Sequence, residues 1–464
     1  MILSKFKLAL TGGVALSMLA IAAPASAFCG FYVAKADTDL FNESSKVAIV
    51  RDGDRTVITM ANDYEGDPTE FAMVIPVPTV ITKNQVHVSD VSLLDHLDAY
   101  TAPRLVEYHD SNPCAPEVME DEIIVTAGRR QGPVLAMSKN LESAADLGVT
   151  IEETFTVGEY DILVLSARES SGLQTWLTTN GYKIPDGADR VLDSYIKQDM
   201  KFFVAKVNLE EKAKAGGEML RPIAVAFESP KFMLPIRLGT VNSKGSQDLF
   251  VYALTRNGRV ETTNYRTTKI PTDVNLPEFV EGDFANVYPA MFSKAIDREG
   301  GSGVVMEYAW DMNWCDPCAA DPLSVAQLKE LGAYWVGGNG DMQRGGGKGM
   351  ARDVYVTRLH VRYDAESFPE DLKFQATGNR ENFQARYVMQ KAFDGSMECK
   401  AANRYKKEVN KRQDREIATL ANLTGWSKPE IREKIKVSGV GMKFEVDGPS
   451  GDNWWSDMWG DKDE

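Results

Sequence analysis

The stretch Trp314–Cys318 holds two cysteines separated by two residues. This spacing lets two sulfur atoms meet across one tight turn. In redox enzymes the first thiol of such a pair lies at a helix N-terminus, whose partial positive charge stabilises the thiolate. In structural pairs the same spacing closes a local disulfide. The residue types therefore suit either thiol–disulfide exchange or a simple cross-link.

The residues after Cys318 favour the cross-link. A helix is expected there, with Asp321 as its cap and Pro322 in its first turn. Such a helix begins several residues beyond Cys318, so its N–H groups would not point at Cys315. No alternation of strands and helices surrounds the pair, although thioredoxin-like enzymes carry one. The negative charge of Asp316 also disfavours a reactive thiolate.

The chain holds an odd number of cysteines: Cys29, Cys114, Cys315, Cys318 and Cys399. In an oxidising compartment an odd number leaves one thiol over or forms a bond to another chain. If Cys315 pairs with Cys318, two of the other three can pair with each other. A long-range bridge such as Cys114–Cys399 would contribute about 2–4 kcal/mol. Spacing does not choose the pairing, so all five remain disulfide candidates.

Other patterns of chemistry are missing from the sequence. The histidines are His87, His96, His109 and His360. They form no His-x-x-x-His pair and no zinc spacing with cysteine. The glycine-rich stretch 336–350 does not match a phosphate-binding loop, because Gly349 follows Lys348 where that loop has Ser or Thr. No catalytic, cofactor-binding or metal-binding residue is assigned, and no cofactor is expected.

Residues 1–27 have the features of a secretory signal peptide. Lys5 and Lys7 form a short positive region, an apolar stretch follows, and the segment ends in Ala-Ser-Ala, a typical cleavage site. We expect export to the periplasm, or secretion, after cleavage at Ala27. No later run reaches the roughly 18 apolar residues of a membrane-spanning helix. The mature chain is therefore expected to lack a transmembrane segment.

The composition excludes some partners. The 464 residues carry a formal net charge of -15, and 43% of them are hydrophobic. The hydrophobic fraction is ordinary for a globular protein with a core. The acidic balance argues against binding nucleic acid or anionic lipid. A partner within the cell envelope, of unknown identity, is expected instead.

Periodicity and turn residues predict the main elements. A β-hairpin is expected over 47–60 around Asp52-Gly53, and a helix over 89–100 with Ser89 or Asp90 as its cap. A helical hairpin should occupy 171–196. The region 202–268 is rich in strands, and Asn257-Gly258 is expected to turn a second hairpin.

Two later stretches have clear faces. In the strand 354–363, Arg358, His360 and Arg362 share one face and apolar residues fill the other. A long helix over 400–421 has a basic stripe opposite its apolar face. The stripe consists of Lys400, Arg404, Lys407, Lys411 and Arg415. In an acidic protein such a stripe is more often a solvated, ion-paired face than a binding site.

These elements predict an α+β fold. It combines mainly antiparallel, sandwich-like β modules with a helical hairpin and a long C-terminal helix, because few strands alternate with helices. The expected segments are a signal peptide (1–27), an N-terminal β-rich module (28–165), a helical hairpin with a second β module (166–275), an α+β portion with the Cys-x-x-Cys and the long helix (276–440) and a disordered acidic tail with three tryptophans (441–464).

Several stretches resemble the bacterial domain-of-unknown-function family 2330. They are Phe28–Ala34, Phe71–Thr79, Asp95–Tyr108, Trp176–Tyr182, Asp311–Cys318 and Thr357–Gln375. The resemblance covers the chain from about Phe28 to about Lys436. It implies an exported bacterial protein and supplies no activity, substrate or catalytic residue.

Two functions lead the interpretation of the sequence, and a metal-dependent hydrolase with scattered ligands ranks below them. The first is an exported, non-enzymatic binding or structural domain of the cell envelope, favoured by the signal peptide, the β-rich body and the structural-looking cysteines. The alternative is a thiol–disulfide oxidoreductase that uses Cys315 and Cys318. The reactivity of these two thiols discriminates between them.

Overall fold

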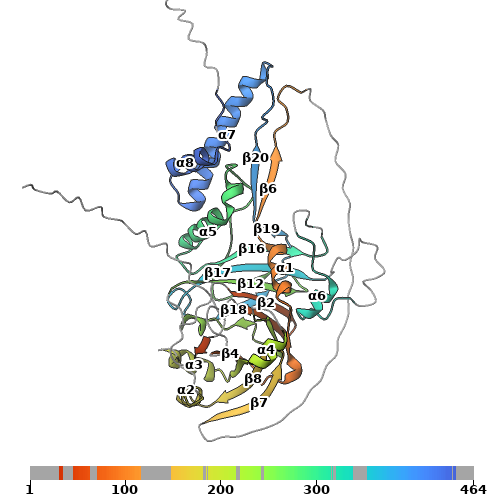
Figure 1. Ribbon diagram of the computed structural model, residues 1–464, viewed down its shortest axis with the longest axis vertical. Coiled ribbons are helices and arrows are strands. Elements are labelled where there is room, and N and C mark those ends of the chain that lie inside the picture. The colour runs from red at the N-terminus through yellow and green to blue at the C-terminus, as the bar shows by residue number, and fades with distance from the viewer. Residues whose placement is uncertain are drawn as a thin grey trace, which may run out of the picture.

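The computed structural model shows an elongated molecule, with a body of β-sheets at one end and a helical arm at the other (Figure 1). The structure describes residues 31–34, 45–62, 71–115, 148–180, 184, 187–215, 220–241, 245–314, 316, 320–337, 353–441 and 443–445. The predicted signal peptide, the glycine-rich residues 338–352 and most of the predicted acidic tail lie outside these ranges. So do three of the cysteines: Cys29, Cys315 and Cys318.

A nine-stranded mixed sheet forms the centre of the body. Its strand order is β14-β16-β17-β12-β2-β3-β10-β5, and β19 pairs with β16 beside this path. The strands are β14 (Thr267–Lys269), β16 (Val304–Asp311), β17 (Tyr355–Tyr363), β12 (Gln247–Thr255), β2 (Ser45–Asp52), β3 (Arg55–Asn62), β10 (Ile223–Glu228), β5 (Val86–Val88) and β19 (Phe383–Gln384). The predicted hairpin is β2–β3, and Gly53 supplies the positive φ of 58° in its turn.

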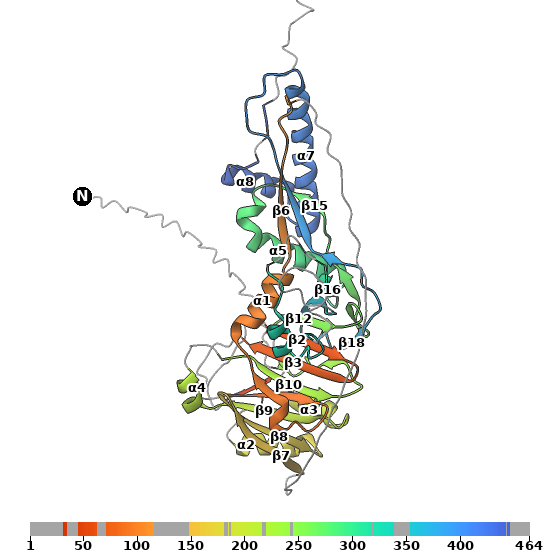
Figure 2. The same ribbon diagram turned by 90° about the vertical axis from the view of Figure 1, so that its right-hand side faces the viewer.

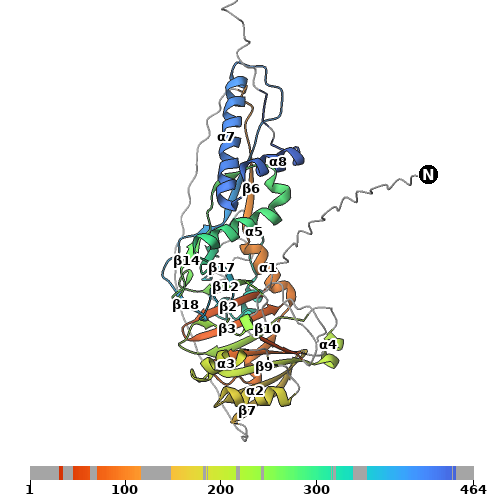
Figure 3. The same ribbon diagram turned by 90° about the vertical axis from the view of Figure 1, so that its left-hand side faces the viewer.

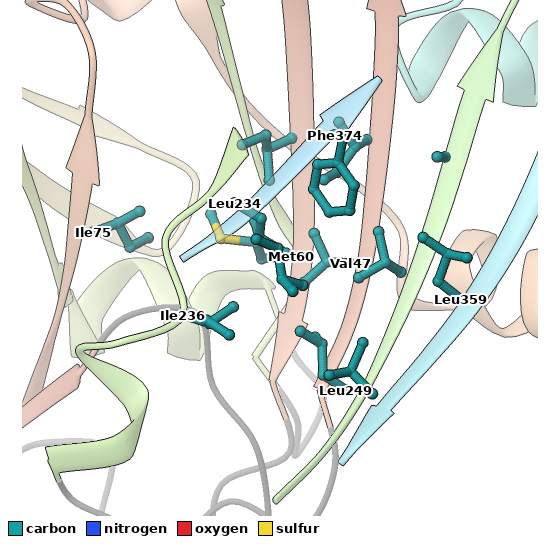
Figure 4. Packing of buried hydrophobic residues seen from close by; sticks show 14 of the residues in the cluster. Val47, Met60, Ile75, Leu234, Ile236, Leu249, Leu359 and Phe374 are labelled. Atoms are coloured by element: carbon teal, nitrogen blue, oxygen red, sulfur yellow. The ribbon is translucent and has the colours of Figure 1, made fainter. Parts of the chain in front are cut away.

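A five-stranded antiparallel sheet packs against the first one. Its order is β1 (Phe31–Ala34), β4 (Phe71–Val77), β9 (Lys201–Val207), β8 (Tyr160–Ala167) and β7 (Val149–Val157). Alternate residues of both sheets meet in one core, where Val47 and Leu249 of the larger sheet belong to the same cluster as Ile75 of the smaller (Figure 4). Each such fully buried aliphatic side chain stabilises the fold by about 1.5–3 kcal/mol.

Helices cover the outer faces of both sheets. The predicted helical hairpin is α2 (Ser170–Thr179) and α3 (Ala188–Ile196), and its Leu173, Leu192 and Tyr195 pack on the five-stranded sheet. On the nine-stranded sheet, α1 (Val91–Thr101) and α6 (Val325–Glu330) bury their leucines against β2 and β12. The cap of α1 is Asp90, whose carboxylate accepts the N–H of Ser92, as the sequence allowed.

The arm is built around a second core. Three parallel strands, β15 (Val274–Leu276), β20 (Arg386–Lys391) and β6 (Arg104–His109), lie beside α5 (Val280–Arg298), α7 (Ala401–Thr424) and α8 (Lys428–Ser438). α7 runs along the arm away from the sheets (Figure 2), and α5 lies between α7 and the body (Figure 3). Val287 and Met291 of α5 join the arm core, whereas Phe292 and Ile296 join the core of the body. α5 therefore connects the two parts.

The predicted turn at Asn257-Gly258 does not form a hairpin. The strand after it, β13 (Val260–Thr262), pairs with β18 (Leu372–Ala376) instead of β12, and β11 (Met233–Leu234) completes this three-stranded sheet. Gly258 has a different role, because a Cβ there would lie 2.3 Å from the carbonyl oxygen of Asn379. The glycine permits a close approach of two backbones. The remaining elements are α4 (Leu209–Ala215) and the short 3-10 helices η2 (Lys83–Gln85) and η3 (Gly239–Val241).

The architecture confirms the predicted α+β class. Most strand pairs are antiparallel, and parallel pairing is limited to β2–β12, β14–β16 and the arm sheet. The predicted long helix is α7, with Ala402, Val409, Ile417 and Leu420 buried as expected. The nine-stranded sheet takes strands from three of the predicted segments, 28–165, 166–275 and 276–440.

Candidate functional site

Two of the five cysteines are joined in the structure. Cys114 and Cys399 form a disulfide with Cα atoms 5.7 Å apart, across a sequence separation of 285 residues. Cys114 follows β6 and Cys399 immediately precedes α7, so the bond fastens the end of the arm sheet to the start of its longest helix. Cys29, Cys315 and Cys318 lie outside the described residues, and their pairing stays a prediction.

Asp316, between Cys315 and Cys318, is bound to side chains of other elements. Its side chain is only 2% exposed. The carboxylate accepts hydrogen bonds from the hydroxyl of Tyr308 at 3.1 Å and from the amide of Gln384 at 2.9 Å. The guanidinium of Arg104 lies 3.8 Å away. The charge of Asp316 is thus neutralised within the protein, which fixes this position of the stretch against the body.

The helix after the cysteines begins later than the sequence indicated. α6 starts at Val325, and its cap is Ser324 rather than Asp321. Ser324 is the cap because Gln327 lies three residues later and completes a capping box. The N–H of Ser324 donates to the side chain of Gln327 at 2.9 Å, and the N–H of Gln327 donates to the hydroxyl of Ser324 at 3.2 Å. Pro322 therefore precedes the helix. Leu323, Leu328 and Leu331, in and next to α6, are fully buried.

A second group of residues forms a buried charged cluster on the outer face of the nine-stranded sheet. A β-bulge in β16 inserts Glu307 between Met306, which faces Leu359, and Tyr308, which faces Arg358. Bulges redirect side chains. Glu307 consequently lies on the same face as Arg358 and His360 of β17, and its side chain is fully buried.

His360 lies between two carboxylates and two aromatic rings. Its Nδ1 is 2.7 Å from Oε1 of Glu307, and its Nε2 is 3.8 Å from Oδ1 of Asp248 on β12. The imidazole stacks on Phe292 of α5 at 3.5 Å between ring centroids and packs on Phe250 of β12 at 4.2 Å. The histidine therefore links two strands and α5 at one buried point.

Two arginines extend the charged cluster. Arg358 donates to Glu307 at 2.6 Å and also pairs with Asp98 of α1, which accepts the hydroxyl of Tyr252 at 2.7 Å. Arg362 binds Asp248 through two hydrogen bonds of 2.7 Å. The two-bond geometry suits a guanidinium and a carboxylate. Arg358 thus joins α1 to the sheet, and Arg362 also donates to the hydroxyl of Ser293 on α5 at 2.7 Å.

The cluster favours charged side chains. Burial raises the pKa of Glu307 when considered alone, but the charges of His360 and Arg358 outweigh burial and the pKa is lowered. Burial likewise opposes charge on His360, yet Glu307 and Asp248 outweigh it and raise the pKa of His360 above its ordinary value. Burial opposes ionisation of Asp248 too, but Arg362 and His360 lower its pKa. An imidazolium between two carboxylates is therefore the preferred state.

The sequence showed only part of this cluster. Alternation placed Arg358, His360 and Arg362 on one face of a strand whose other face is apolar. Three basic residues on a buried strand were the available signal of an ion-pair network. Their partners could not be found, because Glu307 is 53 positions from His360 and Asp98 is 260 positions from Arg358.

A groove of about 580 Å³ opens on the arm, between the first turn of α5 and α8. Phe279 and Val437 supply its apolar lining, and Val437 is 79% exposed. Asp283, Glu430 and Glu433 add acidic side chains to the lining, where Lys434 pairs with Asp283 at 3.0 Å. The lining thus combines apolar and acidic side chains.

Within the described ranges, no group of three or more His, Cys, Asp or Glu side chains is placed to hold a metal ion. None of the helices in that same part of the chain is both long and apolar enough to cross a membrane.

Comparison with known proteins identifies one family. A family model described as "Uncharacterized protein conserved in bacteria (DUF2330)" matches residues 23–375. The match ends at the close of β18 rather than near Lys436, so α7 and α8 lie beyond it. The chain matches no curated protein and no solved structure.

Proposed function

The chain belongs to the DUF2330 family of bacterial proteins, and we propose that it is an exported cell-envelope protein that acts as a binding or structural domain rather than as an enzyme. In this proposal the signal peptide is removed after Ala27, and the mature protein works in the periplasm or outside the cell. Its partner is another component of the envelope.

The observation that carries the proposal is the Cys114–Cys399 disulfide. Stable disulfides form in oxidising compartments and are rare in the bacterial cytosol. This bond lies at the end of the arm, away from the charged cluster, and it fastens two segments that are distant in the sequence. Its position supports a structural role for cysteine in this protein.

The charged cluster also supports a structural role. Glu307, Arg358 and Asp248 each contact an opposite charge, and the cluster joins α1 and α5 to the central sheet. Breaking one member of a buried ion pair costs about 3–5 kcal/mol, so such a cluster fixes geometry strongly. The charged groups of this cluster are already paired with one another, and through α5 they help to hold the arm to the body.

The groove between α5 and α8 is the place where we propose that a partner binds. Its apolar and acidic lining suits a segment that presents an apolar side chain next to a basic one. Val437 would lose its exposure in such a complex. Val437→Asp should weaken binding to the envelope partner by about tenfold or more, since it places a charge in the apolar centre. Val440→Asp, at a 42% exposed position outside the groove lining, is the matched control.

A thiol-exchange assay distinguishes this proposal from the oxidoreductase alternative. We expect no turnover of a disulfide-linked peptide by the wild-type protein. Cys315→Ser/Cys318→Ser should lower the free energy of unfolding by at most about 2–3 kcal/mol, because the loop that a Cys315–Cys318 bond closes is short. Wild-type turnover that disappears in Cys315→Ser would overturn the proposal and establish a thiol–disulfide oxidoreductase.

A further inference from the structure

The basic stripe of α7 differs from the ion-paired face that the sequence indicated. All five of its residues are exposed: Lys400, Arg404, Lys407, Lys411 and Arg415. Arg404 pairs with Glu408 at 2.9 Å. Among the residues that the structure describes, the other four form no ion pair within 4.0 Å, although the positive charge of Arg415 acts on the neighbouring Glu416. Their spacing of three, four or seven residues keeps them on one face over about 22 Å of helix.

The last described residues already lie on α7, next to this stripe. The Nζ of Lys443 is 2.6 Å from the carboxylate of Asp414, and Phe444 exchanges two hydrogen bonds of 2.9 Å with the side chain of Asn410. The ring of Phe444 also packs on Tyr405, 6.3 Å between centroids. Contacts to positions 414, 410 and 405 in this order show that the chain runs antiparallel to α7.

These contacts bring the end of the described chain close to two of the unpaired cations. Lys407 precedes Asn410 by three residues, and Lys411 precedes Asp414 by three, so each is a surface neighbour of a residue that holds the chain. The described chain therefore ends within reach of the stripe, and residues 446–464 follow it. Fully extended, they could reach about 60 Å, which exceeds the length of the stripe.

The composition of 446–464 complements the stripe. The segment holds six acidic residues, Asp447, Asp452, Asp457, Asp461, Asp463 and Glu464, against a single lysine, Lys462. It also holds Trp454, Trp455 and Trp459. Carboxylates pair with lysine and arginine, and indole rings bind these cations over their faces. Both kinds of contact are available to the four unpaired cations.

We propose that residues 446–464 bind along the basic stripe of α7, with their carboxylates and indole rings on Lys400, Lys407, Lys411 and Arg415. Attachment at Lys443 and Phe444 gives the segment an effective concentration in the millimolar range, as for a short flexible linker. An anionic partner in solution would have to displace it.

The test combines carbodiimide cross-linking, which joins lysine to carboxylate at contact distance, with amide hydrogen exchange on the complete chain. We expect cross-links from Lys407 or Lys411 to acidic residues of 446–464. Exchange of the segment should be about tenfold slower than in Lys407→Glu/Lys411→Glu. This protection should fade as salt rises from about 0.01 M to about 1 M, where the Debye length falls to about 3 Å.

The control is Lys83→Glu/Arg190→Glu, which makes the same charge change at two exposed positions on the body. It should leave the exchange of 446–464 as in the wild type. A mixture of isotopically light and heavy protein identifies the source of each cross-link. Cross-links of mixed isotope composition would show that the stripe binds another copy and would overturn the proposal. Free-chain exchange rates in the wild type without cross-links would overturn it as well.

Discussion

At the scale of single residues, Glu307 lies at the centre of the buried charged cluster. It occupies a β-bulge, is fully buried, and accepts bonds from His360, Arg358 and Tyr288. Removal of its charge would leave Arg358 paired with Asp98 alone and His360 with Asp248, 3.8 Å away, as its remaining carboxylate. Uncompensated buried charges are among the most costly defects in a fold.

We predict that Glu307→Gln lowers the free energy of unfolding by about 3–5 kcal/mol in denaturant titrations. Glu370→Gln is the control, because Glu370 pairs with Lys373 at 2.6 Å but both side chains are more than half exposed. It should cost about 0–1 kcal/mol. Equal effects of the two substitutions would contradict the assignment of a buried, charged Glu307.

The raised pKa of His360 predicts a pH dependence. A histidine whose pKa is higher in the folded state binds its proton more tightly there than in the unfolded chain. Its contribution is therefore complete below the unfolded pKa of about 6.5 and is lost as pH rises through the folded pKa. The lowered pKa values of Glu307 and Asp248 act on the acid side, where stability is lost as pH falls through them.

We expect the free energy of unfolding to decrease from about pH 6.5 upward, through the raised pKa of His360, and this decrease to disappear in His360→Gln. His87→Gln, at an exposed position on β5, should retain it. The measurement is a set of denaturant titrations at several pH values. A wild-type stability that stays level or increases over this range would contradict the charged state inferred for His360.

At the scale of elements, contacts between α6 and the central sheet depend on Gly332. This residue follows α6 with a φ of 104°, and a Cβ there would lie 2.5 Å from the side chain of Val57 on β3. Val57 is itself buried. Both the backbone conformation and the space exclude a larger residue at this junction.

We predict that Gly332→Ala destabilises the protein by about 1–3 kcal/mol more than Gly300→Ala. Gly300 also has a positive φ, of 70°, but nothing lies within 4 Å of its Cβ position. The difference between the two variants therefore reports the clash with Val57 together with the less favourable φ of 104° at Gly332. Thermal unfolding measures it, and indistinguishable midpoints would show that β3 and α6 do not pack as described.

The sequence predicted helices, strands and turns more accurately than the contacts between them. The hairpin around Gly53, the helices α1 and α7 and the two faces of β17 were predictable because local periodicity and turn residues determine them. The hairpin predicted at Asn257-Gly258 is wrong, because β13 pairs with the distant strand β18. The cap predicted for α6, Asp321, is also wrong, because Ser324 forms a capping box with Gln327. The ionic partners of His360 come from separate elements, so no local pattern reveals them.

At the scale of the whole molecule, a β-sheet body and a helical arm meet through α5 and are closed by one long-range disulfide. The family match ends before α7, so most of the helical arm lies outside the residues shared with the family model. The segment boundaries expected at 165 and 275 remain a prediction. The basic stripe lies on an unmatched helix, whereas the groove lies between the unmatched α8 and the matched α5.

Cys114→Ser/Cys399→Ser should lower the free energy of unfolding by about 2–5 kcal/mol, because the bond closes a very long loop. Hydrogen exchange should show the loss mainly in β6 and the first turns of α7. The wild-type protein under reducing conditions should behave like the double variant. A variant as stable as the oxidised wild type would contradict a stabilising role of this bond.

The central proposal is an exported protein with structural cysteines, and one measurement tests it most directly. The protein is isolated from its native bacterium, alkylated without reduction, and analysed by mass spectrometry of the intact chain and its peptides. We predict a chain that begins at Phe28 and a peptide pair joined through Cys114 and Cys399. A chain that retains Met1, carries a lipid on Cys29, or has alkylated Cys114 and Cys399 would contradict it.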